Sequence, residues 1–186
     1  MAGKARREHF IALLRGINVG GHNKVPMAEL RVLCDELGWE GVQSYVQSGN
    51  LVFEAAGPPA RLEAELERAI ERRFGLSIAV VVRAAADWPG YVEGNPYPGA
   101  SEREPNGVML ALSKARPKPD AVEGLRERAL CGERIVRVGD ALWIHFGGGV
   151  AKSKLSPALL NRLVGSPVTL RNWRTVLKLD ELARRS

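Results

Sequence analysis

The sequence predicts an α+β protein made of two β-α-β-β-α-β halves followed by a C-terminal helix. Short apolar runs typical of buried strands alternate with segments whose apolar residues recur at helical spacing. Glycine, proline and asparagine separate these segments, and the same order begins again after a connector rich in proline and glycine. This order is that of the ferredoxin-like, or split βαβ, arrangement. The two halves share the order of elements without an obvious sequence repeat.

Residues 9–83 form the predicted N-terminal half. Pro26 suits the first turn of a helix, and Gly38 is a natural helix stop. Ser48-Gly49-Asn50 is a tight turn between two short strands. The expected elements are a strand at 9–17, a helix from Pro26 to Gly38, hairpin strands at 42–47 and 51–54, a helix over 62–74 and a strand at 78–82.

Residues 106–186 form the predicted C-terminal half with its terminal helix. Ser156 followed by Pro157 is a helix start, and Asn172 is placed to cap the last helix. Residues 84–105 are read as a connector with one short helix near Trp88, and residues 1–8 as a disordered basic tail. The expected elements are strands at 108–112, 134–138, 142–146 and 168–170, a helix over 121–130 with Val122, Leu125 and Leu130 inward, and helices from Pro157 and Asn172.

Composition predicts a cytoplasmic globular protein. The 186 residues are 45% apolar and 26% charged, which is ordinary for a domain with a real core. No window approaches 18 consecutive apolar residues, so no membrane span or membrane partner is expected. The N-terminus lacks the apolar segment of a secretory signal. Cys34 and Cys131 are too few for a disulfide framework and fit buried thiols in a reducing compartment.

Positive charge is concentrated at both ends of the chain. Residues 1–26 hold five Lys or Arg and one acid, and residues 151–186 hold eight and two. The middle, 27–150, holds 14 basic and 18 acidic residues. If both ends meet on one face, that face would steer phosphates or other anions. The alternative is an ordinary solvated surface.

Two glycine-rich segments, one in each half, are candidate anion cradles. Arg15–Lys24 and Gly147–Lys154 each follow an apolar strand, carry cations and precede a helix. Such junctions present backbone N–H groups and cations to an anion, and glycine allows close approach of the backbone to a ligand. Neither segment has Walker A or G-x-G-x-x-G spacing. We expect the two segments to face one shared cleft.

Two further segments complete the candidate site. The hairpin turn Gln47–Asn50 is polar and uncharged, although turn chemistry alone also explains it. In Thr169–Thr175, Arg171 and Arg174 flank a helix start, where the helix dipole favours an anion, and Trp173 fits either the core or a stacking platform. The expected ligand-binding residues are Arg15, Asn18, Asn23, Lys24, Gln47, Ser48, Asn50, Lys152, Ser153, Lys154, Arg171, Asn172 and Arg174.

Catalytic and metal chemistry have little support in the sequence. His9, His22 and His145 show no metal-ligand spacing, there is no cysteine pair, and no metal or cofactor is expected. His9 and His145 lie in predicted strands and are read as structural. His22, in the polar loop, is the one candidate for a general acid or base.

Four segments together resemble a bacterial family known as domain of unknown function 1697. They read L-L-R-G-I-N-V-G-G-H-N-K-V-P-M, Y-V-Q-S-G-N-L-V-F, G-G-G-V-A-K-S-K-L and R-N-W-R-T-V-x-K-L. The resemblance covers nearly the whole chain. It implies two ferredoxin-like subdomains and no established activity, so no catalytic residue is transferred. The resemblance implies that the position of His22 is often filled by lysine or another residue, which weakens His22 as an obligatory catalyst and favours a polar or cationic role there.

The leading functional hypothesis is a module that binds a phosphate-bearing ligand, a nucleotide or nucleic acid, in a cationic, glycine-rich cleft. An enzyme acting on a small anionic substrate is the second, with His22, Ser48 or Ser153 handling protons. A structural protein whose cationic ends meet an acidic partner is the third. No oligomeric state is indicated.

Overall fold

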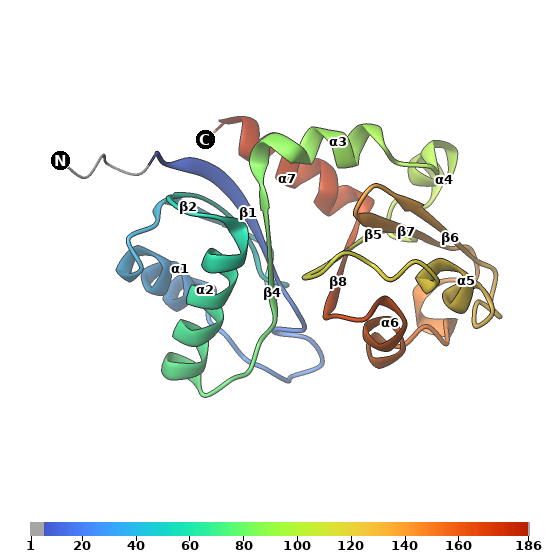
Figure 1. The fold of residues 1–186 in the computed structure, drawn as a ribbon, viewed down its shortest axis with the longest axis horizontal. Helices are drawn as coiled ribbons and strands as arrows, with labels where there is room; N and C mark the ends of the chain where they lie inside the picture. Colours follow the sequence, from blue (N-terminus) through green and yellow to red (C-terminus); the bar gives the residue numbers. More distant parts are fainter. Residues whose placement is uncertain (1–5, 186) are drawn as a thin grey trace. The chain divides into compact units, whose positions relative to one another are not determined.

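The computed structural model describes residues 6–185 and has the predicted order of elements, β-α-β-β-α-β twice followed by a C-terminal helix (Figure 1). The chain divides into two compact units: an N-terminal unit, Met1–Trp88 with Leu179–Ser186, and a C-terminal unit, Pro89–Lys178. Each unit contains one four-stranded antiparallel sheet. The tail predicted at residues 1–8 falls mostly on residues 1–5, which lie outside the described residues, and Glu8 begins the first strand.

The N-terminal unit has strand order β2-β3-β1-β4. Its elements are β1 (Glu8–Leu14), α1 (Met27–Glu36), β2 (Glu40–Tyr45), β3 (Asn50–Ala55), α2 (Pro59–Phe74), β4 (Val80–Ala84) and a 3-10 turn, η1 (Ala85–Asp87). Alternate residues of β1, such as Phe10 and Leu14, pack with apolar residues of both helices, which cover one face of the sheet. Trp39 stacks on Phe53 with ring centroids 4.0 Å apart. This core fixes the strand ends from which the polar loops leave.

The C-terminal unit repeats that topology with strand order β6-β7-β5-β8. Its elements are α3 (Trp88–Glu93), α4 (Pro98–Arg103), β5 (Val108–Ser113), α5 (Ala121–Arg126), β6 (Glu133–Val138), β7 (Ala141–Phe146), the 3-10 turn η2 (Val150–Lys152), α6 (Pro157–Val164), β8 (Val168–Asn172) and α7 (Trp173–Arg185). The last helix, α7, begins in this unit and ends in the N-terminal one.

Both predicted helix caps of the C-terminal unit are confirmed. Ser156 Oγ accepts a hydrogen bond from Leu159 N at 3.2 Å, with Pro157 in the first helical turn. Asn172 Oδ1 accepts from Thr175 N at 2.9 Å. Each side chain satisfies an N–H group that has no partner within its own helix.

Three local expectations were wrong. The connector contains a second helix, α4, because Pro98 starts a helix as readily as it breaks one. The helix expected over 121–130 ends at Arg126, and Leu130 is 78% exposed instead of inward. Cys131 is only half-buried. Cys34 is buried as expected, and burial, with a smaller contribution from Asp35, raises the pKa of its thiol to about 12.

Candidate functional site

The glycine-rich loop of the N-terminal unit is held together by two asparagine side chains. Asn18 Nδ2 donates to Val25 O and Gln47 O, both at 2.9 Å, and Asn18 Oδ1 accepts from Val25 N at 2.9 Å. Asn23 Nδ2 donates to Gly16 O at 3.0 Å. Both asparagines have positive φ, 54° and 48°, which asparagine adopts more readily than most residues. These two candidate ligand-binding amides therefore build the loop.

The hairpin turn between β2 and β3 packs against the end of β1 and the loop that follows it. Leu14 N donates to Gly49 O at 2.8 Å. A Cβ on Gly49 would lie 2.7 Å from Ile17 Cδ1, so only glycine fits there. Asn50 is buried, and its Nδ2 donates to Ser48 Oγ at 3.2 Å. The first two predicted segments thus lie side by side within the N-terminal unit.

Several side chains remain outward at this tip. His22, Lys24 and Gln47 are exposed, and Arg15 is half-buried. Val46, beside them, has φ 52° although it is β-branched, and it is 49% exposed. A branched residue in the left-handed region is a strained conformation of the kind that concentrates at functional sites. These groups are the ones that an outside ligand could reach.

The glycine-rich loop of the C-terminal unit is anchored on Glu133, a buried acid. Ser153 Oγ donates to Glu133 Oε1, and Cys131 N donates to Glu133 Oε2 at 2.8 Å. Burial alone would raise the pKa of the Glu133 carboxyl, but hydrogen bonds from Ser153 and from backbone N–H groups at 131, 133 and 154 outweigh burial and lower it. A Cβ on Gly148 would collide with Cys131 O, so close packing of two backbone segments is one reason for the glycine run. Lys152 and Lys154 are exposed.

The predicted segment around β8 and α7 divides between interior and surface. Arg171 is buried, donates to Thr169 Oγ1 and Leu170 O at 2.8 Å each, and burial lowers its pKa to about 10. Asn172 caps α7, and its Nδ2 donates to Asn106 Oδ1 at 3.3 Å. Trp173 is half-buried and packs on Trp143, with ring centroids 5.8 Å apart. Arg174 is exposed.

A pocket of about 350 Å³ lies where two predicted segments of the C-terminal unit meet. Gly149 and Val150 come from the glycine-rich loop, and Arg174 comes from the first turn of α7. We call it the α7 pocket. Its other walls were not predicted, because half of them come from the connector, where α4 was not expected, and the rest lie beside strands β5 and β7. Those walls are Arg103, Glu104, Pro105, Asn106, Gly107 and Phe146.

The α7 pocket carries both signs of charge. Arg103 and Arg174 are its cations. Glu104 is its acid, with Oε2 3.5 Å from His145 Nε2. Two backbone N–H groups in the first turn of α7 already have partners, because Trp173 N donates to Pro105 O at 3.1 Å and Thr175 N donates to Asn172 Oδ1. An anion here would depend mainly on the two guanidinium groups.

Metal and membrane chemistry find no structural support within residues 6–185. In that range no group of three or more His, Cys, Asp or Glu is arranged to hold a metal ion. No helix of the described part of the chain is both long and apolar enough to cross a membrane.

Comparisons with known proteins point to one family. A family model described as a protein of unknown function (DUF1697) matches residues 7–143. The chain is similar to a solved structure of a conserved bacterial protein from Streptococcus pneumoniae, with 26% identity, a TM-score of 0.71, and coverage of 96% of this chain and 99% of that one. No curated protein matches the sequence.

Proposed function

This chain belongs to the DUF1697 family of proteins of unknown function, and we propose that it binds a phosphate-bearing ligand, in the first place a nucleotide, in the α7 pocket. The observation that carries the proposal is that two segments chosen from sequence for anion chemistry supply Gly149 and Arg174 to one pocket. These segments are separate in the chain, with α6 between them. Their meeting with a second arginine, Arg103, supports a site built for negative charge.

The polar groups of the pocket favour a nucleotide over inorganic phosphate. Arg103 and Arg174 would hold the phosphate, because a guanidinium presents several donors to its oxygens. The Glu104 carboxylate only accepts hydrogen bonds, so it suits sugar hydroxyls or base amino groups. Asn106 can both donate and accept. The volume, about 350 Å³, lies in the range of small-molecule sites.

The loops at the end of β1 and between β2 and β3 in the N-terminal unit offer a second surface, which would suit nucleic acid. Lys24 and His22 are exposed on one loop, with Gln47 exposed on the neighbouring turn. A charged surface of this kind binds phosphates with an affinity that falls steeply as salt rises. That the loops of the two units face one cleft stays a prediction.

The test is a thermal-shift screen of the full chain at low salt against nucleotides, sugar phosphates and mixed oligonucleotides. A ligand that binds only the folded protein raises the melting temperature. We expect a nucleotide to do so, and we expect Arg174→Gln to remove the shift. Arg116→Gln is the matched control, because Arg116 is an exposed arginine of the same unit outside the pocket.

Two results would contradict the proposal. One is the absence of any shift with all three ligand classes. The other is an equal loss of binding in both variants, which would indicate a general charge effect. Binding of oligonucleotides alone, with strong salt dependence, would instead favour the nucleic-acid form of the hypothesis.

A further inference from the structure

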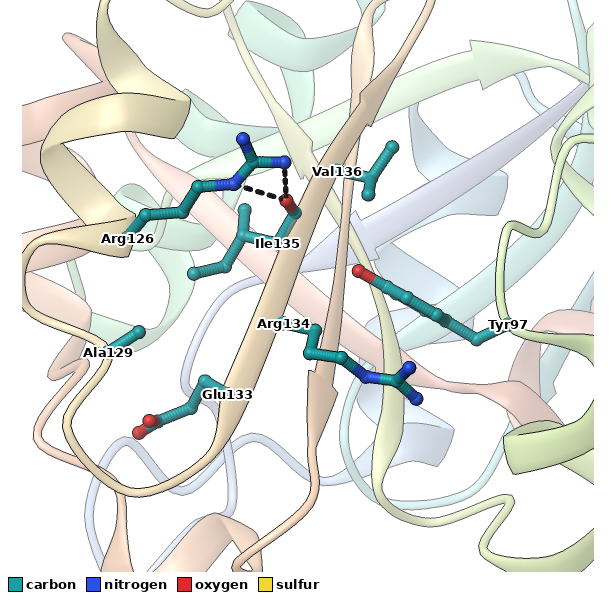
Figure 2. A pocket seen from close by; sticks show the side chains of 7 residues that line it. All are labelled: Tyr97, Arg126, Ala129, Glu133, Arg134, Ile135 and Val136. Carbon is teal, nitrogen blue, oxygen red and sulfur yellow. Dashed lines mark hydrogen bonds between the residues drawn. The ribbon is translucent and has the colours of Figure 1, made fainter.

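A second pocket of about 370 Å³ lies along β6 of the C-terminal unit (Figure 2). We call it the β6 pocket. It shares no lining residue with the α7 pocket. Its walls are Tyr97, Arg126, Ala129, Glu133, Arg134, Ile135 and Val136.

The Tyr97 hydroxyl is the unexplained group of this pocket. Tyr97 is only 8% exposed, and its hydroxyl is buried with no hydrogen-bond partner among the described residues. Figure 2 shows the hydroxyl directed at β6. Burial raises the pKa of Tyr97 against the opposing effect of Arg134 and Arg126, so the group stays protonated and is a donor. Leaving a buried donor unpaired is unfavourable, which suggests a partner from outside the chain.

Arg134 is held beside Tyr97 in a fixed position. Its Cζ lies 5.0 Å from the centre of the Tyr97 ring, and its Nη2 and Nε lie 2.9 and 3.3 Å from His145 Nδ1. A guanidinium only donates hydrogen bonds, so His145 Nδ1 must be the acceptor. These contacts use one edge of the guanidinium and leave Nη1 for a ligand.

Arg126 supplies a second oriented cation. Its Nε and Nη2 donate to Ile135 O at 3.0 and 2.7 Å, which again leaves Nη1 (Figure 2). The one acid of the pocket, Glu133, is bonded to Ser153 and to Cys131 N and points away from Tyr97. The positive charge is therefore not cancelled at the hydroxyl.

We propose that the β6 pocket binds a small organic oxyanion, a carboxylate or phosphate group on a short apolar body. The Tyr97 hydroxyl and the Arg134 guanidinium, which lie on the same side of β6, receive the oxyanion, and Arg126 adds positive charge from the other side of the strand (Figure 2). The side chain of Val136, on the same side of β6 as Tyr97, provides the apolar wall for the body, while Ala129 and Ile135 line the other side of the strand (Figure 2). Two oriented donors beside an apolar wall match the usual design of small-molecule sites.

The test measures binding of benzoate and of phenyl phosphate to the full chain, followed by amide NMR shifts of Ile135 and Val136. Benzyl alcohol is the uncharged probe of similar shape. We expect at least one of the two anions to bind, and to shift these amides, while the alcohol does not. Tyr97→Phe removes only the hydroxyl, so it should fold normally and weaken the anion by about tenfold or more.

Two matched variants separate a site from a general effect. Tyr91→Phe also removes a hydroxyl from this unit, but that hydroxyl bonds to Asp140, so the anion should bind unchanged. Arg174→Gln alters only the α7 pocket and should also leave this binding unchanged. The inference is overturned if neither anion binds, if benzyl alcohol binds equally well, or if Tyr97→Phe binds with wild-type affinity.

Discussion

Gly49→Ala should destabilise the N-terminal unit by more than backbone conformation alone explains. Gly49 has φ 79°, and a left-handed conformation costs an alanine about 1–2 kcal/mol. The new methyl group would also lie 2.7 Å from both Ile17 Cδ1 and Leu14 Cβ. Overpacking of this kind costs about 1–3 kcal/mol, so the total is about 2–5 kcal/mol.

Gly41→Ala is the control for the backbone contribution. Gly41 has φ 61°, but nothing lies within 4 Å of the position of its Cβ. It should therefore lose only about 1–2 kcal/mol. Urea unfolding of both variants gives the free energies, and their difference measures the collision.

Hydrogen exchange provides a local reading of the same change. Leu14 N donates to Gly49 O at 2.8 Å, so exchange at the Leu14 amide should accelerate in Gly49→Ala and stay slow in Gly41→Ala. Equal free energies of unfolding for the two variants would refute the steric argument. So would an unchanged exchange rate at Leu14.

Three further predictions concern the C-terminal unit. The lowered pKa of Glu133 means that its carboxylate stabilises the fold at pH values above its unfolded pKa, near 4.5. This stabilisation is lost as the pH falls through the folded pKa. Glu133→Gln should therefore make the free energy of unfolding, measured by calorimetry, depend less on pH on the acid side. Ser156→Ala should lower the free energy of unfolding by about 1 kcal/mol through loss of the α6 cap, measured by urea titration, and an unchanged value would refute that role. Tyr91→Phe should cost about 1.5–3 kcal/mol because its hydroxyl bonds to Asp140, whereas Tyr97→Phe, with no bond to lose, should melt no lower than wild type in a thermal scan without ligand.

The order of elements was predictable because the strands and helices carry their own periodicity, and two helices of the C-terminal unit also carry side-chain caps. Ser156 and Asn172 were recognised as caps from local chemistry alone. The helix α4 was missed because proline and glycine signal both loops and helix starts. Such ambiguity is resolved by packing, which a local pattern does not contain.

The candidate site was less predictable, because the same side chain can serve a ligand or the fold. Asn18 was chosen as a ligand-binding residue, yet its amide nitrogen donates to Val25 O and Gln47 O, and its amide oxygen accepts from Val25 N. The buried Arg171 donates to its own strand. Conversely, Tyr97 and Arg103 come from the connector and reach their pockets only through tertiary packing. No spacing in the sequence joins them to β6 or to α7.

The contact between Arg126 and Ile135 also bears on self-association. β6 is an outer strand of its sheet, and outer strands carry backbone groups that can pair with another chain. The Arg126 guanidinium donates two hydrogen bonds to one such group, the carbonyl oxygen of Ile135, and so keeps it from pairing with another chain. Arg126 is the last residue of α5, so fraying of that helix would uncover the carbonyl and begin to open a template for intermolecular β-pairing.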